Sequence, residues 1–440
     1  MQSKSEPKIA LVPDLSGMRY QTLWEWLEWQ EGLHFTAIDL GLDRCMTVAK
    51  KLELLSPSYP VISVAGTNGK GSSVKMLDSI LQAAGYKTGC YTSPHLIRYN
   101  ERVQINGKEV ADEEFCNSFN RIDQARGEIS LTYFEFGTLA ALDIFQRSGV
   151  DVAILEVGLG GRLDAVNCID ADAALVTSID IDHEDWLGSD RDSIGLEKAG
   201  IYRSTAPAIC SDPNPPESIL NYAQSLDINL FLHNKDYYYD VGEDSWSWHS
   251  NEITINNLPK PTLYNESQVQ NAAGVIMLLS TIRDRLTVDS DAIRKGIQDF
   301  KLAGRFQVVP DIAQIVLDVA HNRQAANLLV KNLKQLPAAA KTHVLVGMLK
   351  DKDHLAVFKE LSEISDYWHI VTLYDQRGID SLELASKLRK IEKNKPIACY
   401  NNTAEALSYI RSIVKPEDRI VVTGSFLTVG AVIGQLNIQV

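Results

Sequence analysis

The sequence contains no apolar run that approaches the ~20 residues a membrane-spanning helix requires. Its first residues show no continuous apolar segment before a small-residue cleavage site, so we expect no secretory signal and a cytoplasmic location. The six cysteines are scattered without a CxxC pair. That pattern is poor support for a metal site or a disulfide framework and suits a reducing compartment.

A basic stripe is also missing, and the formal net charge is -14. This balance argues against a nucleic-acid partner, because phosphates need clustered lysine and arginine to neutralise them. An acidic protein can still bind anions where the local site is basic or carries metal ions. We therefore expect small-molecule partners, no nucleic acid, no membrane, and a monomer.

The length of 440 residues exceeds one ordinary core and predicts two domains. Apolar segments alternate with helical patterns, which indicates an α/β fold whose parallel sheet is covered on both faces. The first domain covers residues 1–303, and an N-terminal arm is expected over residues 1–20. Helices are expected at 22–30, 72–84, 267–285 and 291–300, and strands at 61–65, 152–157 and 173–178.

Residues 229–262 are rich in aromatic and polar side chains and predict a small antiparallel excursion. Past Gly304 the alternation restarts, which predicts a second α/β domain over 304–440 with the boundary near 302–308. Its strands are expected at 312–319, 344–348, 369–373, 397–400 and 420–423.

A glycine-rich turn at residues 65–73 (AGTNGKGSS) lies between an expected strand and an expected helix. Glycines let backbone amides turn toward an anion, and the following helix adds its positive end. Lys70 would then reach the β- and γ-phosphates, and the Ser72 hydroxyl could hold Mg²⁺. The general phosphate-loop pattern fails, because Val64 and Gly71 stand where glycine and Ser/Thr are usual. A turn that binds nothing therefore remains an alternative.

Residues 66–72 resemble the variant phosphate loop of the Mur ligase superfamily. Later segments resemble one branch of it, the bifunctional dihydrofolate synthase/folylpolyglutamate synthases, in order along nearly the whole chain from about residue 30. The matching segments are 91–96, 131–136, 155–165, 177–179, 182–183, 185–188, 197–201, 304–307, 318–322 and 424–426.

The resemblance implies an N-terminal P-loop ATPase-like domain and a C-terminal Rossmann-like domain, with the active site between them. It implies a ligase that uses ATP to add L-glutamate to dihydropteroate, giving dihydrofolate, and to add further glutamates to tetrahydrofolates. The carboxylate is activated as an acyl phosphate, and ADP and phosphate are released. Two Mg²⁺ ions are implied, because phosphoryl transfer demands charge neutralisation.

The family's functional positions transfer onto this sequence residue by residue. Lys70, Lys198 and His321 would be catalytic, with Lys198 carbamylated. Metal ligands would be Ser72 and Glu156 for one ion and Ser93 and His183 for the other. ATP would contact Thr67, Asn68, Gly69, Lys70, Gly71, Ser72, Asn271, Arg305 and Asp318. The pterin would contact His34, Thr132, Phe134, Leu163, Asp164 and Ala165, and the incoming glutamate His321 and Ser425.

Residue types alone leave plainer roles open for several of these positions. Ser93 precedes Pro94 and could belong to a turn, and His183 could cap or pack locally. Arg305 could form an interdomain salt bridge, and Phe134 could be a core residue.

Lys198 follows Glu197 near an expected helix start, and by type it would be a solvated or paired lysine. The chain also departs from the family pattern at Arg323, where proline is usual, and at Leu427, where histidine is frequent. Either departure could change how glutamate is bound.

Two other functions compete with this interpretation. A cell-wall Mur ligase needs a UDP-sugar domain before its loop, and only ~60 residues precede the loop here. A non-enzymatic nucleotide-binding module would keep Lys70 but would not need Glu156, His183 and Lys198 together.

Overall fold

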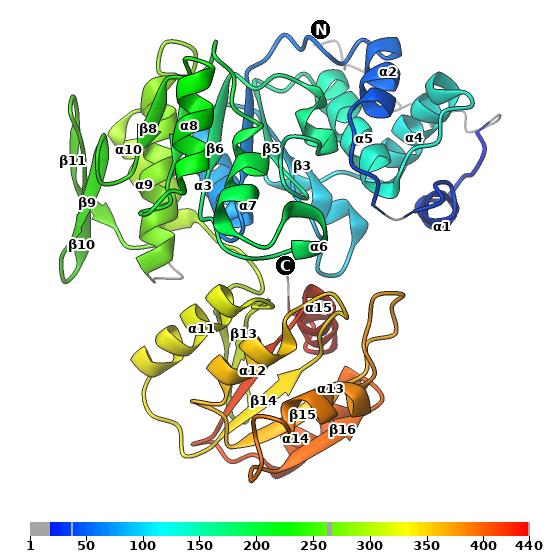
Figure 1. The fold of residues 1–440 in the computed structure, drawn as a ribbon, viewed down its shortest axis with the longest axis vertical. Helices are drawn as coiled ribbons and strands as arrows, with labels where there is room; N and C mark the ends of the chain where they lie inside the picture. The colour runs from blue at the N-terminus through cyan, green and yellow to red at the C-terminus, as the bar shows by residue number, and fades with distance from the viewer. Residues whose placement is uncertain (1–17, 37, 262–265, 439–440) are drawn as a thin grey trace, which may run out of the picture.

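A computed structural model of the chain describes residues 18–36, 38–261 and 266–438. Two main β-sheets, each covered by helices, form an N-terminal part and a C-terminal part that lie one above the other in Figure 1. The predicted α/β class with largely parallel sheets is confirmed. Residues 1–17 of the arm that was expected over residues 1–20 lie outside the described residues.

The N-terminal sheet has the strand order β4-β3-β2-β5-β1-β6-β7-β8, parallel from β2 to β8. In its central strand β1 (Val61–Ala65), Val61 and Ala65 face one core while Ile62 and Val64 face the other. Both faces are therefore buried, which explains the continuous apolar character of the strand. The other strands are β2 (Thr88–Tyr91), β3 (Val103–Ile105), β4 (Lys108–Glu109), β5 (Val152–Glu156), β6 (Ala173–Val176), β7 (Ala208–Cys210) and β8 (Leu230–Leu232).

Helices cover the two faces of this sheet as separate groups. One face packs against α3 (Lys70–Ala83), α9 (Glu266–Thr281) and α10 (Ser290–Asp299). The opposite face packs against a larger group, with the short η1 (Tyr99–Arg102), η2 (Ala165–Cys168) and α6 (Glu184–Leu187) near it. That group is α1 (Leu23–Glu31), α2 (Asp43–Lys51), α4 (Asp112–Arg126), α5 (Tyr133–Ser148), α7 (Arg191–Ala199) and α8 (Glu217–Ser225).

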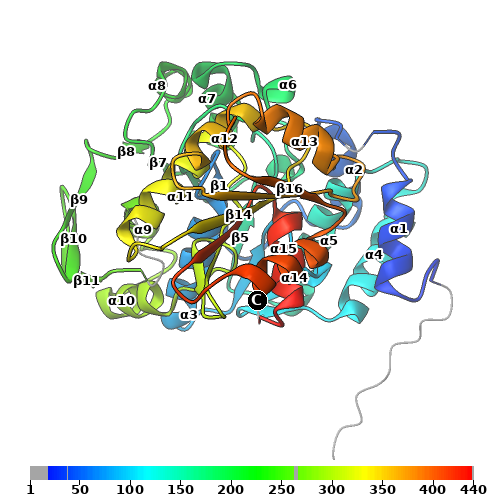
Figure 2. The same cartoon turned by 90° about the horizontal axis from the view of Figure 1, so that it is seen from below.

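An antiparallel sheet of three strands, β9 (Tyr237–Val241), β10 (Ser245–Ser250) and β11 (Thr254–Pro259), packs against α9 and α10. Figure 2 shows it at the outer edge, on the side away from α1 and α4. The antiparallel excursion was expected over residues 229–262. Its expected start was too early, because β8 pairs with β7 in the main sheet.

The C-terminal sheet has the order β12-β13-β17-β14-β15-β16, and only β12 is antiparallel to its neighbour. Helices α11, α12 and α13 cover one face, and α14 and α15 the other. The expected strand 312–319 was too long, and β12 was not predicted. The bounds are β12 (Gln307–Val309), β13 (Gln314–Leu317), β14 (Thr342–Val346), β15 (Tyr367–Val371), β16 (Ile397–Tyr400), β17 (Arg419–Thr423), α11 (Arg323–Gln335), α12 (His354–Leu361), α13 (Ser381–Leu388), α14 (Thr403–Ile413) and α15 (Phe426–Gln435).

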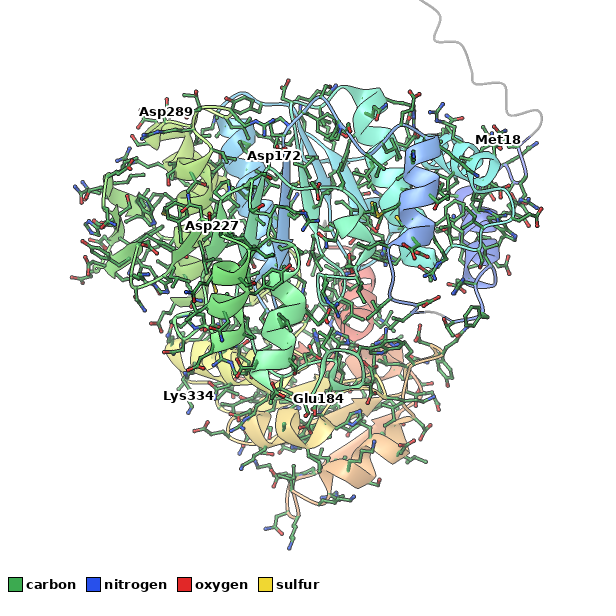
Figure 3. All side chains as sticks on the ribbon, turned by 45° about the horizontal axis from the view of Figure 1, so that its top comes forward. Met18, Asp172, Glu184, Asp227, Asp289 and Lys334 are labelled. Carbon is green, nitrogen blue, oxygen red and sulfur yellow. The ribbon has the colours of Figure 1, made fainter. Side chains whose placement is uncertain are left out.

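The chain passes from one part to the other through residues 300–306, where Gly304 and Phe306 have positive φ angles of 66° and 49°. The carboxyl ends of the parallel strands in both sheets point toward this junction, the usual place for a ligand site in open α/β sheets. In Figures 1 and 3, α6, with Glu184 labelled in Figure 3, lies on the side of the N-terminal part that faces the C-terminal part. None of the described helices has both the length and the apolar character needed to traverse a membrane.

Candidate active site

The loop between β1 and α3 takes a conformation that favours glycine at two positions. Gly66 and Gly69 have φ angles of 149° and 92°, and a Cβ on Gly66 would lie 1.8 Å from Oγ1 of Thr177. Helix α3 begins at Lys70, so the amides of its first turn lack partners within the helix and face the loop. A loop of this geometry before a helix N-terminus can bind an anion, which is the role that the sequence predicts for these residues.

Lys70 reaches back over this loop. Its Nζ donates to the carbonyl oxygens of Gly66 at 2.8 Å and Thr67 at 3.2 Å. Desolvation lowers the pKa of Lys70, while the charges of Glu156 and Asp182 oppose that shift. An ammonium group has three N–H donors, so one donor remains for a phosphate oxygen.

Helix α9 supports the loop from the other side. Oδ1 of Asn271 lies 2.5 Å from the position that a Cβ on Gly69 would take, and Gln268 Nε2 donates to Ser72 Oγ at 3.2 Å. Thr67 Oγ1 donates to the Asp180 carbonyl at 3.0 Å, which ties the loop to the segment after β6. The positions expected to contact ATP in the N-terminal part are therefore contiguous.

Glu156 ends the buried strand β5 and is only 4% exposed. Its Oε2 accepts from the Ser93 backbone amide at 3.2 Å, and a Cβ on Gly71 would lie 3.7 Å from the same oxygen. Burial raises the pKa of Glu156, against the charges of Lys70 and Arg305. A carboxylate in such a place is costly unless a cation or a donor compensates it.

The donors around Glu156 fit a hard divalent ion. The Ser72 and Ser93 segments meet at the Glu156 carboxylate, and Mg²⁺ prefers oxygen ligands together with phosphate oxygens. Within the described residues, no group of three His, Cys, Asp or Glu side chains converges to hold an ion by itself. The predicted ions would therefore depend on hydroxyls and on nucleotide phosphates.

His183 lies at the start of α6 with a positive φ of 55°, beside Asp182. Its Nε2 is 3.4 Å from the Nζ of Lys352, a residue of the C-terminal part. Desolvation and the Lys352 charge lower the pKa of His183 to about 4, so the ring is neutral at neutral pH. A neutral imidazole has a lone pair for a metal ion, although Mg²⁺ prefers oxygen.

Lys198 was expected near a helix start, but it lies in the last turn of α7. It is also only 4% exposed, so the plainer prediction of a solvated lysine was wrong. Desolvation and the charge of Lys70 lower the pKa of Lys198 to about 7. A substantial neutral fraction at neutral pH is what carbamylation of a lysine requires.

The C-terminal part presents four expected site residues near the junction. Arg305 stacks over the Phe426 ring at 5.3 Å, and Ser425 is the N-cap of α15. Both oxygens of Asp318 accept backbone amides, from Phe306 at 2.8 Å and Ala320 at 2.9 Å. Nδ1 of His321 lies 2.8 Å from the Val319 carbonyl.

Two of the expected pterin residues also have clear structural roles. Thr132 is the N-cap of α5, and Asp164 accepts the amides of Leu159 at 2.8 Å and Val166 at 3.0 Å. Burial raises the pKa of Asp164 to about 6, against those hydrogen bonds. Phe134 is half-buried and lies against Gly158, where a Cβ would come within 2.5 Å of its ring.

The remaining expected pterin positions lie beside this group. The Gly41 amide donates to the Leu163 carbonyl at 3.2 Å, which places the end of the loop after His34 next to Leu163. His34 is buried and contacts Ser130 at 2.7 Å and Asp39 at 3.0 Å. Ala165, the other expected position, begins η2 and is buried.

Sequence reasoning did not assign two residues that the structure brings to these sites. Lys352 follows β14 and pairs with Asp182, while Arg44 pairs with Asp39 at 2.7 Å and Glu135 at 3.2 Å beside the His34 loop. Lys352 stands between Asp351 and Asp353, a pattern typical of a solvated surface. The position of Lys352 after an apolar strand of the parallel sheet was the signal in the sequence that could have identified it as a site residue.

Comparison with known families gives two matches. The family model described as "Mur ligase middle domain" matches residues 64–225, and that described as "Mur ligase, glutamate ligase domain" matches residues 304–426.

Curated relatives match over most of the chain. A dihydrofolate synthase/folylpolyglutamate synthase of Escherichia coli is 44% identical over 93% of this chain and 94% of its own length. The protein of that name from Haemophilus influenzae is 41% identical over 92% of this chain and 96% of its own length.

Solved structures are also similar. Escherichia coli FolC in complex with DHPP and ADP has a TM-score of 0.89 and 43% identity, covering 95% of this chain and 98% of that chain. A bifunctional folylpolyglutamate synthase/dihydrofolate synthase with Mn, AMPPNP and L-glutamate bound has a TM-score of 0.87 and 41% identity, covering 95% and 98%.

Proposed function

The chain belongs to the dihydrofolate synthase/folylpolyglutamate synthase family of Mur ligases, and on that premise we propose how it uses ATP to form amide bonds to glutamate. It adds L-glutamate to dihydropteroate to give dihydrofolate, and it adds further glutamates to tetrahydrofolates. The observation that carries the proposal is the meeting of the phosphate loop, the buried Glu156 and the strand ends of the C-terminal part at one junction.

In the first step an oxygen of the pterin-linked carboxylate attacks the γ-phosphorus of ATP. A new O–P bond forms, the bond to the β-phosphate oxygen breaks, and the products are an acyl phosphate and ADP. Phosphoryl transfer needs alignment and charge neutralisation more than covalent help. The loop amides, Lys70 and Arg305 supply fixed positive charge and donors for this step.

In the second step the amino group of glutamate attacks the acyl carbon, and phosphate leaves as the amide forms. The ammonium of free glutamate must first lose a proton. Nδ1 of His321 lies 2.8 Å from the Val319 carbonyl, which orients its ring at the junction, and we assign His321 as the catalytic residue that holds the incoming glutamate, with the proton released to water. Ser425 would orient the incoming amino acid.

Ser72, Ser93, Glu156 and His183 would hold two Mg²⁺ ions, whose chemistry is to neutralise the charge of the phosphates. Two similar solved structures contain Mn and AMPPNP, which supports the use of a divalent ion. Carbamylation of Lys198 would convert a buried amine into a carboxylate near these ligands. The lowered pKa of Lys198 supports this modification.

We place the pterin against Phe134, with Asp164, Thr132, Leu163, Ala165 and the loop around His34 near it. The half-buried Phe134 ring beside Gly158 offers a flat apolar surface on which an aromatic ring can stack. We also place the domain boundary between residues 303 and 304, and propose a cytoplasmic monomer. Six free cysteines are consistent with a reducing compartment.

The test is an ATP-dependent assay with dihydropteroate and with tetrahydrofolate as alternative acceptors. We expect ADP release only when an acceptor and L-glutamate are both present, with one amide formed for each ADP. Equal ADP release without an acceptor would contradict the proposal. Lys70→Ala should abolish turnover and retain the circular dichroism spectrum, and undiminished ligation by this variant would remove the loop assignment.

A further inference from the structure

Three side chains of the C-terminal part approach one carboxylate of the N-terminal part. Oδ1 of Asp182 is 2.7 Å from Lys352 Nζ, and Oδ2 accepts from Asn322 Nδ2 at 3.1 Å. Nε2 of His321 lies 3.7 Å from the same Oδ2. Asp182 follows β6, whereas His321 and Asn322 follow β13 and Lys352 follows β14. The carboxylate therefore joins strand ends of two different sheets.

The ion pair is almost completely removed from water. The side chains of Lys352 and Asp182 are 5% and 11% exposed. A buried ion left without its partner is costly, so each half of the pair disfavours an arrangement in which the other has moved away.

Asn322 extends this contact to the phosphate loop. Its Nδ2 donates both to Asp182 and to Oδ1 of Asn68 at 3.2 Å, while its Oδ1 accepts from the Ala325 amide at 2.9 Å. Gln324 adds a contact to Nδ2 of Asn68 at 2.5 Å. The side-chain amide of Asn322 has only two hydrogens, and both are used across the junction.

Lys352 is itself held firmly within the C-terminal part. Arg377 Nη2 contacts both oxygens of the adjacent Asp351 at 3.0 Å, and the Lys350 amide donates to the Arg377 carbonyl at 2.8 Å. The His354 side chain bonds the Leu349 carbonyl at 2.9 Å. The backbone on both sides of Lys352 is therefore anchored within the C-terminal part.

We propose that Asp182 and Lys352 are positioning residues for ligation, whose buried ion pair sets the C-terminal strand ends against the phosphate loop. The inference rests on the proposed function, because the two steps need groups from both parts at once. His321 is four residues past the end of β13 and next to Asn322, so the same contacts fix its place relative to Lys70. Misplacement of catalytic groups by about 1 Å can lower a rate by ~10²-fold.

The first experiment compares Lys352→Met, Asp182→Asn and the double variant in the ligation assay. We expect kcat to fall ~10- to 10²-fold in each, while KM for ATP and for dihydropteroate changes less than about 3-fold. The fold-loss of kcat in the double variant should be about the same as in either single variant, because the two residues act as one unit. Lys352→Arg keeps the charge and should recover part of kcat.

Lys341→Met is the matched control, since it removes a lysine from an exposed ion pair with Asp366 in the same sheet. It should keep wild-type kcat. The inference is overturned if kcat of the Lys352 and Asp182 variants stays within about 2-fold of the wild-type value. It is also overturned if the fold-loss of kcat in the double variant equals the product of the two single losses, as for independent sites.

A second measurement does not depend on activity. Amide hydrogen exchange in the presence of AMPPNP should rise in residues 321–326 and 349–354 of Lys352→Met, while β1 and α3 remain as protected as in the wild type. Unchanged exchange in those two segments would overturn the inference, whichever reaction the protein catalyses. A wild-type protein that forms no amide with either acceptor would instead contradict the proposed function.

Discussion

The side chain of Asn271 occupies the space next to Gly69 that any larger residue would need. Its Oδ1 lies 2.5 Å from the ideal Cβ position, and Gly69 has a φ of 92°. Both the contact and the backbone angle select glycine here. The phosphate loop is thus shaped by a helix that begins almost 200 residues later in the chain.

Gly69→Ala should therefore impair nucleotide binding with little change in the remainder of the fold. We expect KM for ATP to rise at least ~10-fold, because the new methyl group must displace either Asn271 or the loop. Steady-state kinetics with varied ATP will measure this. Gly127→Ala is the control: Gly127 also has a positive φ of 57°, but nothing lies within 4 Å of its Cβ position. Equal KM values for the two variants would contradict the role of the Asn271 contact.

The buried amine of Lys198 predicts a modification that depends on pH and on carbon dioxide. Its pKa is lowered to about 7, so the neutral amine increases as the pH rises through that value. We expect the carbamate to increase between about pH 6 and about pH 8 in bicarbonate, as seen by ¹³C NMR with labelled bicarbonate. Lys198→Arg should show no such signal and should lose most of kcat. A signal that persists in Lys198→Arg would assign the carbamate to another lysine.

Asp164 should matter more for the pterin than for the nucleotide. Asp164→Ala removes the acceptor for the Leu159 and Val166 amides, and loss of such a cap costs about 1 kcal/mol of stability. We expect KM for dihydropteroate to rise at least ~10-fold and KM for ATP to rise less. Asp164→Asn keeps one acceptor oxygen and should be milder. Equal increases in both KM values would indicate a structural role alone.

Two buried histidines in the C-terminal sheet predict acid sensitivity. His343 Nδ1 lies 3.1 Å from His369 Nε2, and His369 Nδ1 lies 3.0 Å from the Tyr400 hydroxyl. Burial lowers the pKa of His369 to about 3 and also lowers that of His343. The unfolded chain binds protons near ~6.5 that the folded chain does not, so stability falls as the pH drops below that value.

The free energy of unfolding should drop by about 2 kcal/mol through His369 between about pH 7 and about pH 5, and His343 should change it in the same direction. Urea unfolding at both pH values will measure it. His369→Gln should reduce the drop. An unchanged drop in His369→Gln would exclude this histidine as the cause.

The sequence identified the segments around the phosphate loop well, because their signals are local. The apolar residues 61–65 form β1 as predicted, and the glycine-rich turn leads directly into α3. The buried Glu156 was predicted from a carboxylate at the end of an apolar run. Short-range rules suffice where a strand, a turn and a helix follow one another.

Such short-range rules could not predict the contacts between side chains of the N-terminal and C-terminal parts. Lys352 and Asp182 are 170 residues apart, and only the folded arrangement of two sheets brings them together. Lys198 was expected near a helix start but lies in the last turn of α7, because the pair Glu197 and Lys198 does not by itself separate the start of a helix from its end. Asp164 and Thr132 carry capping roles that residue identity alone does not separate from ligand contacts.

Arg305 stands between Gly304 and Phe306, the two residues of positive φ in the connecting segment. When two bodies rotate about a covalent joint, points near the pivot sweep the shortest arcs and distant points the longest. The guanidinium would therefore stay close to the junction over a range of angles between the two sheets, while the loop after β14 moves farther.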